Sequence, residues 1–120
     1  MKMKSSQSEA QAPESAAIPQ IPEKQILILS NLSRTRSTSG MELRKLIAEL
    51  GLPLKGPSYY QFMARLEHAG LVEATHELIQ TDVQPLTIKN YTLTAAGEEQ
   101  IKIAADFYRV LLVRILKNTQ

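Results

Sequence analysis

The sequence predicts a mainly helical α+β fold with one small β-hairpin, arranged as a winged helix-turn-helix unit followed by a long C-terminal helix. Three segments with helical periodicity follow one another between residues 22 and 69. β-prone residues then form a predicted hairpin over about residues 72–93. Residues 95–120 contain one further helical pattern, which is longer and rich in apolar residues. The order of three helices and a hairpin is typical of the winged helix-turn-helix fold.

Composition supports a single folded domain. Of the 120 residues, 43% are apolar and 22% are charged, and this is enough for one core plus an arm. The absence of cysteine excludes disulfides, thiolate metal sites and cysteine nucleophiles. Because 14 Lys and Arg are balanced by 12 Asp and Glu, any affinity for nucleic acid must depend on where the basic residues lie.

The chain divides into three predicted parts. Residues 1–21 are rich in Ser, Gln, Ala, Glu and Pro and predict a disordered N-terminal arm. Residues 22–94 form the predicted winged helix-turn-helix domain, and residues 95–120 form a predicted dimerisation helix. The arm lacks the apolar run of a signal peptide, and no apolar stretch reaches the ~20 residues of a membrane span. We therefore expect a cytoplasmic protein without membrane contact.

The first two helices are predicted from their ends and their apolar spacing. Pro22 is a favourable first residue for a helix over about residues 22–33. Residues 34–40 are polar and turn-rich, and Ser39 can cap the second helix, which Gly51 ends. The apolar residues of the second helix follow a spacing of i, i+3, i+4 and i+7, and we expect them to be buried: Leu43, Leu46, Ile47 and Leu50.

The third helix is predicted over about residues 57–69, since Pro57 favours its start and Gly70 its end. Its inward face repeats the same spacing with Tyr59, Phe62, Met63 and Leu66. The hairpin strands follow, with residues 81–84 as their connection, and Thr94 or the residues after it begin the last helix.

Four short blocks of sequence indicate a family. They are Gly-Met-Glu-Leu at 40–43, Ser-Tyr-Tyr at 58–60, Leu-Glu-His-Ala-Gly-Leu-Val at 66–72 and Tyr-Thr-Leu-Thr-Ala-Ala-Gly at 91–97. Together they resemble the PadR-like transcriptional regulators, although MarR-like and other winged-helix families share parts of them. The resemblance implies a regulator, expected to be a repressor, that binds double-stranded DNA with a recognition helix at about 57–69 and a wing at about 72–93.

Two features depart from the family pattern. Met41 stands where PadR-like proteins usually have an aromatic residue. The wing carries Glu73, Glu77 and Asp82 against one basic residue, Lys89, whereas the family wing is commonly basic. Because each lost phosphate contact lowers the salt slope of binding by about 0.9, we expect weak binding to nonspecific DNA.

The outward face of the third helix supplies the predicted reading residues. Arg65 suits a bidentate contact to guanine, and Gln61 suits adenine. Ser58 and Tyr60 suit phosphate near the helix start, and His68 lies on the same face. The alternative is a solvated surface, or for Tyr60 a packed position between the second and third helices.

The other DNA-binding candidates are basic residues on neighbouring segments. We expect them to contact phosphates beside the recognition helix, since loops next to a groove-reading helix often meet the DNA backbone. The alternative is a solvated polar face. They are Arg34, Arg36, Arg44, Lys55 and Lys89.

The last helix contains a heptad pattern that predicts homodimerisation. Apolar residues recur at intervals of seven, as in a two-stranded seam. Since a second apolar face is also present, one small domain cannot cover both, and a second copy is the simplest partner. The alternative is a helix that folds back over its own domain. The predicted interface residues are Ile101, Ala104, Ala105, Tyr108, Leu111, Leu112 and Ile115.

No catalytic, metal or cofactor site is predicted. His68 and His76 lack the helical spacing of a metal pair, and there is neither a Gly-rich phosphate loop nor a nucleophile elbow. The resemblance leaves open a small-molecule effector, for which the sequence identifies no site. The alternative function is a winged-helix module that binds another protein through its last helix or its acidic wing.

Overall fold

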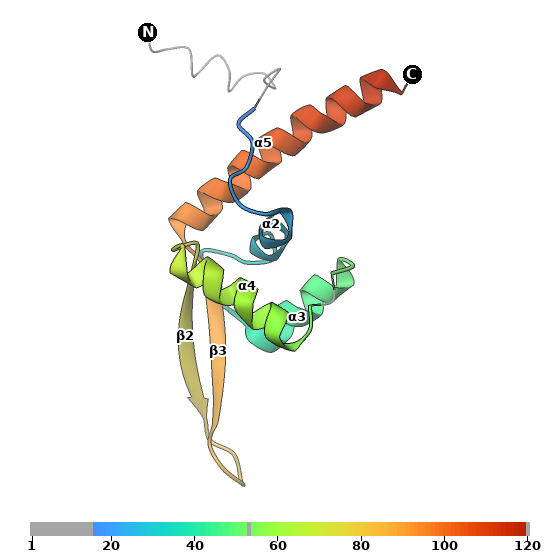
Figure 1. Ribbon diagram of the computed structural model, residues 1–120. Coiled ribbons are helices and arrows are strands. Elements are labelled where there is room, and N and C mark those ends of the chain that lie inside the picture. Colours follow the sequence, from blue (N-terminus) through green and yellow to red (C-terminus); the bar gives the residue numbers. More distant parts are fainter. Residues whose placement is uncertain (1–15, 53, 120) are drawn as a thin grey trace.

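Four helices and a three-stranded sheet make up the computed structural model, which describes residues 16–52 and 54–119. Three short helices pack together, while strands β2 and β3 extend away from them on one side and helix α5 on the other (Figure 1). This is the predicted α+β fold with a long C-terminal helix. The elements are α2 (Glu23–Leu29), β1 (Thr38–Ser39), α3 (Gly40–Glu49), α4 (Gly56–His68), β2 (Val72–Ile79), β3 (Leu86–Leu93) and α5 (Ala95–Asn118).

Part of the predicted N-terminal arm is described. Residues 16–21 contain neither helix nor strand, and Ile21 packs half-buried against the core. The segment joins the folded domain at this residue. Residues 1–15 lie outside the described residues, so the disordered arm stays a prediction there.

Helix α2 is shorter than predicted, because it ends at Leu29 and not near Ser33. The reason is local hydrogen bonding. The Ser30 hydroxyl and the Asn31 side-chain amide both donate to the carbonyl oxygen of Leu27, at 2.7 and 2.9 Å. Such side-chain bonds compete with the backbone pattern that would continue the helix.

Helix α3 begins as predicted, since the Ser39 hydroxyl accepts a hydrogen bond from the Glu42 amide at 3.2 Å. Gly51 follows the helix with a φ of 90°, a conformation that favours glycine. Leu43 and Ile47 are buried in the core. The prediction for Leu50 was wrong: this side chain is 56% exposed because it lies beyond the last helical turn.

The sheet contains the predicted hairpin and one strand that was not predicted. β2 and β3 pair antiparallel from Val72 with Leu93 to Ile79 with Leu86. β1 pairs antiparallel with the other edge of β3, so the strand order is β1-β3-β2. β1 has two residues, too few for an alternating pattern, and it lies in the segment that was predicted as a turn.

Helix α5 is fixed at its start by a cap and a close packing contact. The Thr94 hydroxyl accepts from the Gly97 amide at 3.0 Å and donates to the carbonyl oxygen of Gly70 at 2.6 Å. A side chain at position 97 would place its Cβ 2.2 Å from the carbonyl oxygen of Leu71. Only glycine therefore allows α5 to cross so close to the loop between α4 and β2.

The hydrophobic core lies between α2, α3, α4 and the base of the hairpin. Its most buried side chains are Ile28, Leu29, Leu43, Ile47, Tyr59, Met63 and Leu66. The radius of gyration is 17.9 Å, whereas a compact chain of this length has about 14 Å. The excess comes from the wing and α5, which project from the core in opposite directions (Figure 1).

Candidate nucleic-acid interface

The outer face of α4 presents the predicted reading residues to solvent. Tyr59, Met63 and Leu66 are buried, so the opposite face of the helix is turned outward. On that face Ser58, Tyr60, Gln61, Arg65 and His68 are all exposed. Tyr60 is 60% exposed, so the alternative of a packed position between α3 and α4 was wrong.

Arg44 lies beside the start of α4 and is held there by two aromatic rings. Its guanidinium carbon is 4.9 Å from the ring centroid of Tyr59 and 5.8 Å from that of Tyr60. The two rings meet edge to face at 5.3 Å. Within residues 16–52 and 54–119, Arg44 forms no ion pair with a carboxylate. Its positive charge is therefore positioned without being neutralised.

A groove of about 590 Å³ lies between the starts of α3 and α4 and the middle of β3. Met41, Tyr60 and Leu86 give it apolar walls, and Arg44 and Lys89 give it positive charge. Among the residues that the structure describes, no Asp or Glu lines it. The groove is thus positive although the wing as a whole is acidic.

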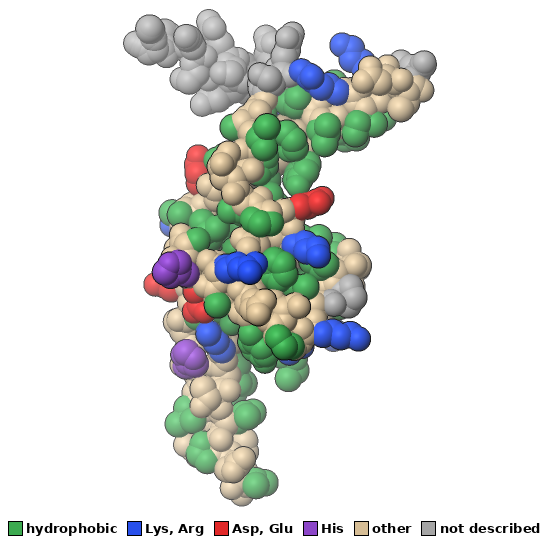
Figure 2. Space-filling model, viewed as in Figure 1, with side chains coloured by type: hydrophobic (Ala, Val, Ile, Leu, Met, Phe, Trp, Pro, Cys, Tyr) green, Lys and Arg blue, Asp and Glu red, His purple; other side chains and the backbone are tan. Residues whose placement is uncertain are grey.

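Charge is distributed unevenly over the molecule. In the face shown in Figure 2, Lys and Arg side chains lie over the helices and the upper wing, and the wing tip shows none. Instead, the wing exposes large apolar side chains, with Leu78 61%, Val83 91% and Leu86 54% exposed.

Two of the predicted phosphate-binding residues are already paired with carboxylates. Lys89 Nζ lies 3.3 Å from Glu67 Oε1, and Arg34 Nη1 lies 3.4 Å from Glu98 Oε1. Arg36 and Lys55 are exposed, and neither forms an ion pair within the described part of the chain. Glu67 and Glu98 were not predictable as partners, because they lie 22 and 64 residues along the chain from Lys89 and Arg34, respectively.

The Lys89 ammonium lies near both a carboxylate and an aromatic ring at the edge of the groove. It lies 5.6 Å from the ring centroid of Tyr91, in addition to its contact with Glu67. Partial burial alone lowers the pKa of Lys89, but the interactions with Tyr91 and Glu67 outweigh burial and raise it. Lys89 is therefore fully protonated at neutral pH.

Tyr59 connects the two helices that border the groove. Its hydroxyl donates to the carbonyl oxygen of Gly40 at 3.4 Å, joining α4 to the start of α3. Burial and the neighbouring Tyr91 raise the pKa of the Tyr59 phenol far above its ordinary value. The phenol thus stays protonated and acts as a hydrogen-bond donor.

The predicted dimer interface on α5 contains both residues that pack against their own chain and residues that are exposed. Ala104 is 2% exposed and Ile101 packs against the core, so these two residues already contact their own chain. Ala105 is exposed, as are four larger members of the predicted seam: Tyr108, Leu111, Leu112 and Ile115.

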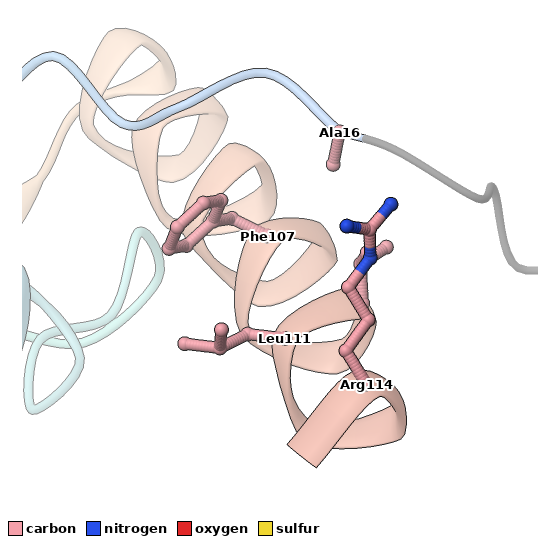
Figure 3. Close-up of a pocket in the computed structure, with 5 residues that line it drawn as sticks. Ala16, Phe107, Leu111 and Arg114 are labelled. Carbon is pink, nitrogen blue, oxygen red and sulfur yellow. The ribbon is translucent and has the colours of Figure 1, made fainter. Parts of the chain in front are cut away.

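The N-terminal segment passes close to the same helix. Figure 3 shows Ala16 near Phe107, Leu111 and Arg114 of α5, and together with Val110 these residues line a shallow hollow of about 200 Å³. One face of α5 is therefore partly covered by the chain itself.

No group of three or more His, Cys, Asp or Glu among residues 16–52 and 54–119 is placed to hold a metal ion. None of the helices described is both long and apolar enough to cross a membrane.

Comparison with known proteins identifies the family. The sequence profile of the transcriptional regulator PadR-like family matches residues 28–103, which is more than half of the chain. No curated protein matches. A PadR family transcriptional regulator from Eggerthella lenta is 28% identical, with a TM-score of 0.59 and coverage of 80% of each chain. A PadR family transcription regulator from Clostridium difficile is 22% identical, with a TM-score of 0.68 over 82% of this chain and 100% of that one, and supports the fold.

The matched region includes α3, α4, the wing and the start of α5, and therefore all the predicted DNA-binding residues. Members of this family are DNA-binding regulators and not enzymes. The resemblance seen in the sequence is confirmed, and the chain belongs to the PadR-like family of transcriptional regulators.

Proposed function

We propose that this protein is a sequence-specific regulator that binds double-stranded DNA as a homodimer and represses transcription. Residues 22–94 would bind the DNA, and residues 95–120 would join the two copies. The observation that carries the proposal is the exposed polar face of α4, which lies beside a positive groove without carboxylates. A helix of this size fits the major groove, where base edges can be distinguished.

The residues of α4 divide into base-reading and positioning groups. Arg65 is exposed, and its guanidinium carbon lies 5.7 Å from the ring centroid of Phe62. This cation–π contact favours one orientation of the Arg65 side chain. It suits a bidentate contact to guanine, while Gln61 on the same face suits adenine. Ser58 and Tyr60 at the helix start suit phosphate oxygens, and His68 stands at the other end of the face.

Phosphate contacts on either side of α4 would come first from Arg44, Arg36 and Lys55. These three carry no carboxylate partner in the described residues. Arg34 and Lys89 would each have to leave a carboxylate before binding a phosphate. We therefore expect Arg34 and Lys89 to contribute less to nonspecific affinity than the other three.

Homodimerisation is supported by the exposed apolar side chains along α5. Tyr108 is 37%, Leu112 55% and Ile115 48% exposed. Such a row of apolar side chains on a long helix is unfavourable in water and favourable against an identical helix. Two copies related by a two-fold axis would place two α4 helices against an inverted repeat. Occupancy of such an operator is the proposed basis of repression.

Replacing Arg65 tests the role of α4. Arg65→Glu should lower affinity for a duplex that the parent selects by at least about tenfold, because it removes a base contact and adds repulsion. Lys24→Glu, an equal charge change at an exposed position on α2, should have a smaller effect. Fluorescence anisotropy with competing unrelated duplex measures both. If Arg65→Glu binds the selected duplex as the parent does, α4 is not the reading helix.

A second candidate function rests on the exposed apolar wing tip. Leu78, Val83 and Leu86 on an acidic hairpin suit a protein partner better than a phosphate backbone. This candidate would be favoured if a correctly folded dimer bound no duplex at all.

A further inference from the structure

The only basic residue of the wing is held by a carboxylate of α4. Lys89 is the one Lys or Arg in residues 72–93. Its ammonium nitrogen lies 3.3 Å from Glu67, which stands in the last turn of α4. The pair therefore links the wing to the helix that is proposed to enter the major groove.

We propose that Glu67 is a specificity-determining residue, whose carboxylate competes with DNA phosphate for the ammonium group of Lys89. In a nonspecific complex the ion pair stays closed, and the wing contributes no phosphate contact. When α4 is seated on its operator, a backbone phosphate replaces Glu67 at Lys89. This inference rests on the proposed DNA-binding function.

The geometry allows this exchange. The side chains of Lys89 and Glu67 are 40% and 33% exposed, so a phosphate can reach the ammonium without unfolding the wing. A partly exposed ion pair of this kind is weak, and a phosphate offers an equivalent charge-assisted hydrogen bond. Lys89 also lines the groove, and none of the described residues that line it with Lys89 is an Asp or Glu that could compete with a phosphate.

The exchange has a measurable consequence in salt dependence. Each phosphate contact contributes about 0.9 to the slope of log affinity against log salt concentration. If Glu67 holds Lys89 in nonspecific complexes, that contribution is missing from nonspecific binding. Removing the carboxylate should restore the contribution and reduce the preference for the operator.

Glu67→Gln, made in the full-length chain, tests the proposal against a matched control. Glu73→Gln makes the same change in net charge, and Glu73 is an exposed residue of β2 that forms no ion pair within the described part of the chain. Binding to an unrelated duplex is measured over a salt series. Glu67→Gln should bind severalfold more tightly at low salt, with a slope steeper by about 0.9, whereas Glu73→Gln should keep the parent slope.

A double variant shows whether the effect acts through Lys89. With Lys89→Gln in place, adding Glu67→Gln should give no steeper slope and no gain in affinity. Equal slopes for Glu67→Gln and Glu73→Gln would overturn the inference while leaving the proposed function intact. If neither the folded parent nor Glu67→Gln bound any duplex, the inference and the proposed function would both fail.

Discussion

The position of α5 depends on the absence of a Cβ atom at Gly97. A Cβ at this site would lie 2.2 Å from the carbonyl oxygen of Leu71 and 2.7 Å from Leu93 Cδ1. The first of these neighbours is backbone, which cannot move aside as a flexible side chain does. Helix α5 must therefore shift if any larger residue replaces this glycine.

Gly97→Ala should destabilise the fold by about 1–3 kcal/mol, the usual cost of forced overpacking. Helix propensity alone predicts the opposite sign, since alanine in a helix is favoured over glycine by about 1 kcal/mol. Thermal unfolding should show a melting temperature lower by at least about 4 °C. Ala96→Gly, an exposed neighbour without this contact, measures the propensity effect alone. A more stable Gly97→Ala protein would show that α5 does not pack this closely.

Single residues also show which parts of the site could be predicted from sequence. The exposure of Gln61 and Arg65 follows from the periodicity that buries Met63 and Leu66, so the outer face of α4 was predictable. The pairing of Lys89 with Glu67 was not, because it depends on how β3 lies relative to the end of α4 in the folded chain. Sequence spacing cannot identify such tertiary partners.

Among the elements, α5 has two roles along its length. Its first turns, including Ile101 and Ala104, pack onto the domain. Its remaining turns extend beyond the three short helices and, apart from Val110 and the half-buried Phe107, expose their apolar side chains. The helix has 24 residues and so a length of about 36 Å, which is more than the domain alone can cover.

Changing both Tyr108 and Leu112 to Glu should convert the proposed dimer to a monomer. The two side chains lie one helical turn apart on the exposed part of α5, and charges there would be buried unpaired in a dimer. Sedimentation at several concentrations measures the change, and circular dichroism verifies that the helices are kept. Lys102→Glu, at an exposed polar position on α5, should remain dimeric. A double variant that sediments like the parent dimer would place the interface elsewhere.

The elements were predicted best where local signals mark their ends. Ser39 and Thr94 cap α3 and α5 as expected, and Gly51 and Gly70 follow α3 and α4 with positive φ. β1 was missed because two residues carry no periodic signal and are held as a strand by pairing with β3. The prediction for the end of α2 failed where Ser and Asn side chains compete for a carbonyl.

For the whole molecule, the shape favours a DNA-binding dimer over an isolated globule. The principal extents are 60 × 36 × 20 Å, because the wing and α5 project on opposite sides of a small core. One projection would reach along DNA and the other would reach a second copy. The fold class was predictable from the order of the elements, since that order fixes which helix precedes the wing. The side on which α5 leaves the core was not, because it depends on the Gly97 contact.

The central claim, a dimer that reads a specific duplex through α4, is tested most directly by selection from a random pool of DNA duplexes. Selection is made at near-physiological salt, where nonspecific binding is weak, and enriched sequences compete with unrelated duplex. We expect enrichment of an inverted repeat whose half-sites lie about one helical turn, or a multiple of it, apart. A correctly folded dimer that enriches no sequence would contradict it.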